Sequence, residues 1–237
     1  GAGQHRDFVF FALFSEITMD IEFFLKERTK FTRYFHENAS KPFIGIMNAI
    51  DNGDSPYNDP PYSEDGEPPF LNEWLEANDA YNSVGLASLS MLSSALQLYL
   101  SCWADRFERI DKPLKRTNKK GWLYAYKKIT ENFGVDYSQC PVDFEVIEQI
   151  VLARNRTQHE EDITSNRIQH SKKDLSRHPS PHFVSDLDMK TLLKDDNSWW
   201  MMPQVYIDKK KLEDTVQVIE KFCFWLEREY ERILTPN

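Results

Sequence analysis

The sequence predicts a mainly α-helical protein, and three of its properties lead to this fold class. Glycine is scarce, with 8 residues in 237, whereas turn-rich all-β proteins need many. Sixteen Phe, ten Tyr and six Trp can fill a sizeable core, and apolar residues recur at helical spacing over several long stretches. The 41% hydrophobic and 28% charged content is that of an ordinary globular chain. We therefore expect residues 1–237 to form a single helical domain.

The first expected helix runs from Arg6 to about Glu37. Apolar and mostly aromatic residues recur along it at three-, four- and seven-residue steps: Phe10, Phe14, Ile17, Ile21, Phe24, Phe31 and Phe35. Charged residues lie off this line. Such a stripe is typical of the side of a helix that packs in a core, so we expect these side chains to be buried.

A long acidic loop is expected over residues 51–69, which hold five prolines and two glycines. Nine Asp or Glu and no Lys or Arg lie between Asp51 and Asp79, so this stretch accounts for the formal charge of −9 and the rest of the chain is balanced. The local field, rather than the total charge, decides whether a polyanion can approach a site. The acidic composition therefore does not exclude RNA as a partner.

The second helix is expected from about Leu71 to Arg109. Its apolar residues fall on one side: Leu86, Leu89, Leu92, Leu96, Tyr99, Leu100 and Trp103. The uncharged stretch from Asn82 to Ala104 is long enough to span a bilayer, but it contains six serines and a glutamine. We therefore expect a buried helix of a bundle and no membrane partner.

The cysteines and the N-terminal segment favour a cytoplasmic location. Cys102, Cys140 and Cys223 are odd in number and far apart, and none belongs to a Cys-x-x-Cys pair. We expect small buried hydrophobes in a reducing compartment, and no metal-ligand spacing is present. The apolar run from Phe8 to Phe14 is followed at once by acids rather than by a cleavage site, so no secretory signal is indicated.

Three elements are expected in the second half of the chain. A short helix covers Gly121 to Asn132, and a further helix runs from Phe144 to about Glu160 with Asp143 as its cap. The last helix starts at Asp208, and its apolar residues are Val216, Ile219, Phe222, Cys223, Leu226 and Tyr230.

The stretches between these helices are less regular. Residues Ser165–Pro181 are polar and turn-prone. Residues Ser198–Ile207 are rich in aromatic and β-branched side chains, which favours a short β-hairpin or strand pair before the last helix. The predicted fold is therefore a helical bundle with a long acidic loop and a small extended element.

The helix from Phe144 ends in an unusual polar sequence, Arg154-Asn155-Arg156-Thr157-Gln158-His159. At about 100° per residue, Arg154 falls within the apolar stripe that contains Ile147 and Val151. An arginine on a buried face needs a charged partner, a subunit contact or a ligand. Asn155 and His159 are four residues apart and are neighbours on one flank of the helix.

These side chains suit the cleavage of RNA by its own 2′-hydroxyl. An imidazole titrates near neutrality and can take the 2′ proton, and a guanidinium can hold two phosphate oxygens while an amide orients either group. We therefore predict Arg154, Asn155 and His159 as catalytic residues that need neither a metal nor another cofactor. Arg-Asn followed by His at this spacing occurs by chance about 0.017 times in such a chain.

The motif and its surroundings resemble the HEPN superfamily, whose ribonucleases carry Arg, four to six residues and His, often with Asn after the Arg. The resemblance also covers the serine- and leucine-rich helix over 84–103, the stretch 126–159 and the closing helix from Val205. It implies a HEPN-like helical bundle and an endoribonuclease used as a toxin or in phage defence. It also implies a homodimer through the motif helix, and an antitoxin or nucleotidyltransferase as a further partner.

Several residues and functions are left open by the sequence. Arg156 and the basic segment with Lys115, Arg116, Lys119 and Lys120 are either contacts to RNA phosphates or solvated surface charges. The chain is either a HEPN ribonuclease, a non-catalytic HEPN module that binds RNA, a nucleotide or a protein partner, or a helical interaction protein in which the motif is accidental.

Overall fold

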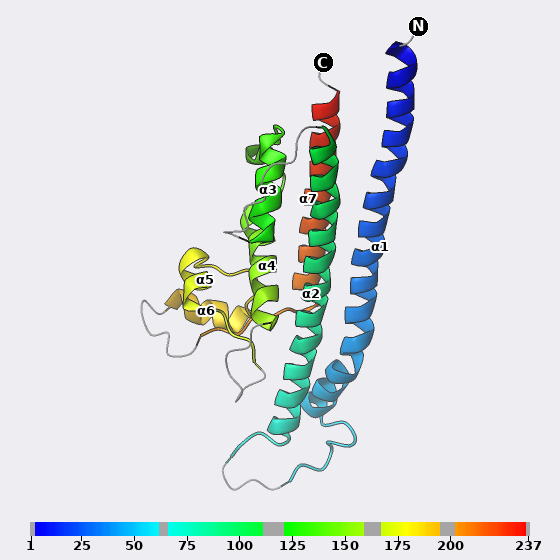
Figure 1. Ribbon diagram of the computed structural model, residues 1–237. Coiled ribbons are helices and arrows are strands. Elements are labelled where there is room, and N and C mark those ends of the chain that lie inside the picture. The colour runs from blue at the N-terminus through cyan, green and yellow to red at the C-terminus, as the bar shows by residue number, and fades with distance from the viewer. Residues whose placement is uncertain (1–2, 62–65, 111–120, 159–166, 195–201, 236–237) are drawn as a thin grey trace. The chain divides into compact units, whose positions relative to one another are not determined.

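The computed structural model describes residues 3–61, 66–110, 121–158, 167–194 and 202–235, with side chains described throughout except at 3–20, 108–110 and 192–194. Within these residues the protein is helical and contains no β-strand, which confirms the all-α prediction. The helices are α1 (Gly3–Asn52), α2 (Leu71–Ile110), α3 (Trp122–Asn132), α4 (Phe144–Gln158), α5 (Lys172–Arg177), α6 (Asp186–Lys194) and α7 (Lys209–Leu234) (Figure 1).

The chain divides into two compact units, each assembled from segments that are far apart in the sequence. Unit 1 comprises Gly1–Phe31, Met91–Val151 and Asp214–Asn237, and unit 2 comprises Thr32–Ser90 and Leu152–Glu213. The helices α1, α2, α4 and α7 contribute residues to both units. Neither unit is therefore a continuous piece of the chain.

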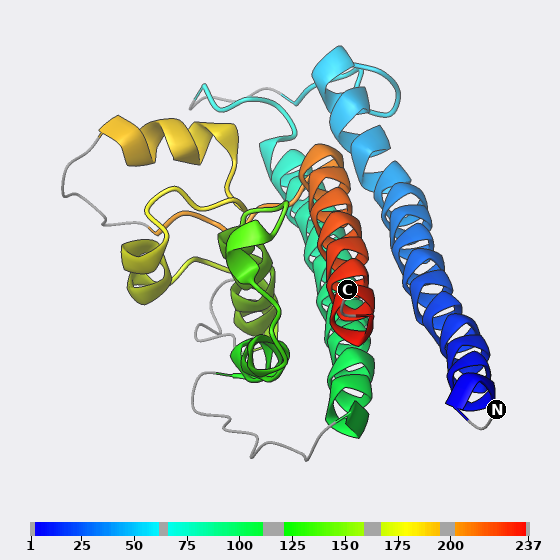
Figure 2. The same cartoon turned by 90° about the horizontal axis from the view of Figure 1, so that it is seen from above.

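The core of unit 1 lies where α2 and α7 run side by side (Figure 2). Tyr99 of α2 donates a hydrogen bond from its hydroxyl to the backbone carbonyl of Cys223 at 2.7 Å. Trp103 and Phe107 pack edge-on against Tyr230, with ring centroids 4.6 Å and 4.7 Å away. All the residues of the predicted α2 and α7 stripes are buried, so both predicted core faces are confirmed.

The first helix differs from the prediction in its length and in the face it buries. It continues past Glu37 to Asn52 and contains Pro42 in its interior, a position that a proline seldom occupies. Phe24 and Phe31 are 60% and 56% exposed, so their predicted place in the core was wrong. The buried positions are instead Leu25, Thr29, Thr32, His36 and Ser40.

Polar contacts explain why α1 buries this other face. In unit 1, Thr29 Oγ1 donates to the Glu220 carboxylate of α7 at 2.7 Å. In unit 2, Arg33 Nε donates to the Glu213 carboxylate at 2.8 Å. A buried face held by hydrogen bonds need not be apolar, and a search for apolar spacing does not find it.

An extended segment before α7 occupies part of the predicted hairpin. Residues 198–201 of that prediction lie outside the described residues, and residues 203–205 pair with residues 168–170 rather than with each other. The Val205 N–H donates to the carbonyl of Ile168 at 2.8 Å, and the His170 N–H donates to the carbonyl of Pro203 at 3.0 Å. One antiparallel bridge joins Gln169 and Gln204.

Two short helices of unit 2 were not predicted. The Ser165–Pro181 stretch contains α5, where the Ser171 hydroxyl accepts a hydrogen bond from the Asp174 N–H and Leu175 is buried. Helix α6 follows, with Ser185 accepting from the Asp188 N–H. Both helices are too short for apolar periodicity to be recognised, and their caps are the only sequence signal. The described parts of the predicted loop, 53–61 and 66–69, are not helical.

The three cysteines lie in different environments. Cys223 is buried in the core of unit 1, Cys140 is half-buried and Cys102 is exposed. The expectation of three buried thiols was therefore wrong for Cys102. Burial raises the pKa of both the Cys140 and the Cys223 thiol.

Among the described residues, one helix is long and apolar enough to cross a membrane by length and composition. It spans Leu71–Phe107 and has a window of mean hydropathy 1.3. Of that window, 56% is buried inside the protein.

Candidate functional site

Residues 154–158 of the predicted motif lie on the last turns of α4, which starts as the sequence predicts. The Asp143 carboxylate accepts a hydrogen bond from the Glu145 N–H at 2.9 Å and so caps the helix N-terminus. Along the predicted stripe, Ile147 is 0% exposed and Val151 is 8% exposed, whereas Arg154 is half-buried. The apolar face therefore ends where the charged motif begins.

Arg154 and Asn155 contact each other directly. The Arg154 Nη1 donates to the Asn155 side-chain oxygen at 3.2 Å, at an exposed position. No carboxylate within the described ranges forms an ion pair with Arg154. The guanidinium therefore keeps most of its donors for another group, while the Asn155 amide restricts its orientation.

The backbone of the motif turn is held by a hydroxyl pair that the sequence did not suggest. Thr157 Oγ1 donates to the backbone carbonyl of Arg154 at 2.7 Å. The same hydroxyl lies 3.3 Å from the Ser90 hydroxyl of α2, within unit 2. Bonding of a threonine to a carbonyl one turn earlier is common in helices, but its partner on another helix is set by the fold alone.

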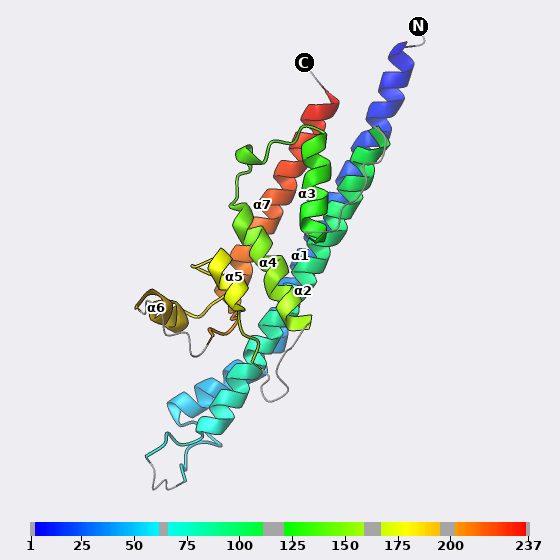
Figure 3. The same ribbon diagram turned by 60° about the vertical axis from the view of Figure 1, so that its left-hand side comes forward.

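Arg156 is neutralised within the protein. Its Nε lies 3.1 Å from a carboxylate oxygen of Asp174 on α5, and the two side chains are 25% and 17% exposed. Figure 3 shows the ribbons of α4 and α5. The alternative role as a contact to RNA phosphate is weakened, because a half-buried ion pair would have to open first. Asp174 could not be found from the sequence, since α5 was not predicted.

His170 is the histidine that the structure places near this ion pair, although the sequence gave it no role. Its Nε2 is 2.7 Å from the backbone carbonyl of Phe183, so this nitrogen carries the proton and donates. Burial lowers the pKa of His170, and the positive charge of Arg156 also lowers it. His170 is therefore a half-buried imidazole that links Phe183 to the extended segment of unit 2.

The remaining predicted site residues are not placed. His159 lies outside the described residues, so its predicted proximity to Asn155 stays a prediction. Lys115, Arg116, Lys119 and Lys120 also lie outside the described residues.

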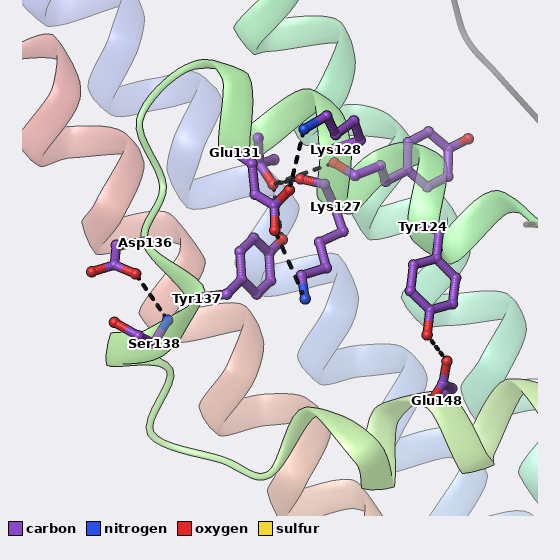
Figure 4. Close-up of polar contacts among 10 residues, drawn as sticks. Tyr124, Lys127, Lys128, Glu131, Asp136, Tyr137, Ser138 and Glu148 are labelled. Carbon is purple, nitrogen blue, oxygen red and sulfur yellow. Dashed lines mark hydrogen bonds and ion pairs between the residues drawn. The ribbon is translucent and has the colours of Figure 1, made fainter. Parts of the chain in front are cut away.

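The two lysines that follow this basic segment are engaged within unit 1 (Figure 4). Lys127 and Lys128 lie 3.8 Å and 3.9 Å from the Glu131 carboxylate. The Lys127 ammonium also lies 4.8 Å from the centre of the Tyr137 ring and 4.5 Å from that of Phe144. An ammonium between two aromatic faces is held by the protein itself and is a poor candidate for RNA contact.

Figure 4 also shows how the start of α4 is fixed in unit 1. The Tyr124 hydroxyl of α3 donates to the carboxylate of Glu148 on α4. Glu148 is 7% exposed, so this hydrogen bond satisfies a buried acid. In the described part of the chain, no group of three or more His, Cys, Asp or Glu is placed to hold a metal ion.

The resemblance to the HEPN superfamily therefore depends on the motif at the end of α4 and on its helical setting. The structure adds the Arg154–Asn155 contact to that setting. No family model, curated protein or solved structure matches the chain.

Proposed function

We propose that the protein is a metal-independent endoribonuclease whose reaction is carried by Arg154, Asn155 and His159. The observation that supports this most directly is the Arg154 guanidinium, which no carboxylate of the described residues neutralises. Arg156, two residues later, is paired with Asp174. Of the two motif arginines, Arg154 is thus the one available to an anion.

The proposed reaction is an internal displacement at phosphorus. The His159 imidazole removes the proton of a ribose 2′-hydroxyl, and the 2′-oxygen forms a bond to the adjacent phosphorus. The bond from phosphorus to the 5′-oxygen of the next nucleotide breaks, and that oxygen takes a proton from an acid or from water. The products are a 2′,3′-cyclic phosphate end and a 5′-hydroxyl end, so no oxidant, reductant or cofactor is needed.

Arg154 and Asn155 would act on the charge that develops in this step. Two donors of a guanidinium can contact two nonbridging oxygens of the phosphate, where negative charge grows in the transition state. The Asn155 oxygen, which accepts from Arg154 Nη1, fixes one end of that guanidinium beforehand. A group already oriented loses less entropy when the phosphate binds.

The proposed assembly is a homodimer in which the ends of two α4 helices line one cleft, as the HEPN resemblance implies. Arg154 lies at the end of an apolar stripe and is half-buried, which would suit the edge of a subunit contact. Mass measurement in solution should then give about twice the 28.0 kDa of the chain. As a toxin or phage-defence nuclease, the dimer would act on cellular RNA in the cytoplasm.

The test is incubation of RNA with the wild type in excess EDTA, followed by detection of 2′,3′-cyclic phosphate ends. His159→Ala should lower the cleavage rate by about 10²–10⁴-fold and Arg154→Ala by about 10²–10³-fold. Arg228→Ala is a matched control, because Arg228 is an exposed arginine of α7 that stacks on Phe224. Equal cleavage by wild type and His159→Ala would contradict the proposal, and binding of RNA without cleavage would indicate a non-catalytic module.

A further inference from the structure

The ion pair between Arg156 and Asp174 joins α5 to the end of α4 within unit 2. The distance of 3.1 Å leaves no room for a water molecule between the two groups. Lys172 and Lys173 directly precede Asp174, and consecutive Cα atoms are about 3.8 Å apart. Both lysines are therefore close to the turn of α4 that carries the motif.

The orientation of α5 directs these lysines into solvent. Leu175 and His178 are 6% and 5% exposed, so that side of the helix faces the interior of unit 2. Lys172 and Lys173 are exposed, and within the described ranges neither forms an ion pair. Ser171 caps the helix through the Asp174 N–H at 3.0 Å, which fixes the start of α5 and hence the two lysines.

The charge around these lysines favours a polyanion. The single acid of residues 167–178, Asp174, is paired with Arg156, and Arg167 is paired with Asp79. The exposed Lys172 and Lys173 therefore supply the positive charge beside the end of α4. At physiological salt, the negative charge of the rest of the chain is screened over about 8 Å. The local positive field is therefore what an approaching phosphate meets.

We propose that Lys172 and Lys173 form a subsite for the RNA backbone beside the end of α4. The inference rests on the proposed function, and it assigns to α5 the part of the RNA that flanks the cleaved phosphate. Lysine ammonium groups bind phosphates as point charges, so the subsite holds the strand regardless of base sequence.

The experiment separates binding from cleavage by using a labelled 2′-O-methyl RNA oligonucleotide. Its methylated 2′-oxygens cannot attack phosphorus, so fluorescence anisotropy reports binding alone. The test variant is Lys172→Glu/Lys173→Glu. The matched control is Lys210→Glu/Lys221→Glu, which makes the same change of net charge at two exposed lysines of α7. Lys172→Arg/Lys173→Arg keeps the charge, and circular dichroism checks the folding of each variant.

The expected result is at least tenfold weaker binding for Lys172→Glu/Lys173→Glu, with wild-type affinity in the Arg variant and a smaller effect in the control. Loss of two phosphate contacts should also reduce the slope of log K against log salt concentration by about 1.4 for a single strand. On unmodified RNA, KM should rise while kcat stays near that of the wild type.

Two outcomes overturn the inference: wild type that does not bind the oligonucleotide, or equal weakening in the test and control variants. If wild type cleaves RNA but the two variants bind equally, the subsite is wrong and the proposed function stands. If wild type binds through the lysines but never cleaves, the subsite stands and the proposed function fails.

Discussion

Asn82 of α2 hydrogen-bonds the extended segment on both sides of Tyr206. Its amide nitrogen donates to the Val205 carbonyl at 2.9 Å, and its amide oxygen accepts from the Ile207 N–H at 3.1 Å. In this way one side chain replaces the neighbouring strand that the segment lacks on that side. Asn82 is 1% exposed, and Val205 and Ile207 are fully buried.

Asn82→Ala should therefore destabilise the protein by about 2–4 kcal/mol, because it leaves a buried carbonyl and a buried N–H without partners. The measurement is the free energy of unfolding in urea. Asn38→Ala is the control, since Asn38 donates to the Tyr34 carbonyl at an exposed position and should cost less than about 1 kcal/mol. Equal losses of stability in the two variants would show that the buried Asn82 contacts contribute no more than the exposed hydrogen bond of Asn38.

Gly85→Ala should cost about 1–3 kcal/mol, because a Cβ at this position would overlap the backbone carbonyl of Ile207. Gly45→Ala is a close control within another helix, since a Cβ there meets nothing within 4 Å. That control should stabilise the protein by about 0.5–1 kcal/mol, as alanine is the better helix former. Thermal unfolding of both variants shows whether each is more or less stable than the wild type. A Gly85→Ala variant more stable than the wild type would contradict the close approach of Gly85 to the Ile207 carbonyl.

The contribution of Glu227 to stability should fall between pH 5 and pH 8. Burial and the nearby Glu22 and Glu231 raise the pKa of this carboxyl from 4.5 to about 7, although Arg106 opposes the shift. Because the native state holds the proton more tightly than the unfolded chain, the stabilisation is complete below pH 4.5 and is lost as the pH rises to about 7. The loss is on the order of 1–3 kcal/mol.

Glu227→Gln should remove most of this dependence, as measured by urea unfolding at pH 5 and pH 8. Glu37→Gln, at an exposed glutamate of α1, is the control and should keep the wild-type dependence. A Glu227→Gln variant with an unchanged pH dependence would assign the effect to other groups.

Asn155→Ala should reduce cleavage about tenfold or more, because Arg154 would lose the oxygen that orients it. Asn155→Gln keeps a neutral amide oxygen as an acceptor at this position and should recover part of the rate. The measurement is single-turnover cleavage of RNA, in which a positioning role lowers the rate constant rather than the affinity. If both variants lost activity equally, Asn155 would instead contact the RNA itself.

The sequence predicted the parts of the fold that depend on apolar periodicity. In α2 and α7 the stripes are long and unbroken, and residues such as Leu92 and Phe222 are buried as expected. In α1 the same argument selected the wrong face, because Thr29 and Arg33 satisfy carboxylates of α7 while Phe24 and Phe31 remain exposed. Apolar periodicity identifies an amphipathic helix, but it does not show which face of that helix packs against the other helices.

In the candidate site, only the features that depend on residues close together in the sequence could be predicted. The position of Arg154 and Asn155 on a helix capped by Asp143 follows from residues within about three turns of them. The contacts of Arg156 with Asp174 and of Thr157 with Ser90 join residues 18 and 67 positions apart. Such long-range pairs depend on how helices pack, and no pattern within α4 contains that information.

Because the three cysteines differ in burial, their reactivity with a thiol reagent can report how often the protein unfolds. A thiol-alkylating reagent should modify Cys102 within the folded state, whereas Cys140 is half-buried and its raised pKa leaves less of the reactive thiolate. Cys223 should react only when the contact between α2 and α7 opens, because it lies inside that core. The ratio of label at Cys223 to label at Cys102 therefore measures, in a single unmodified sample, how often the core of unit 1 is exposed to solvent.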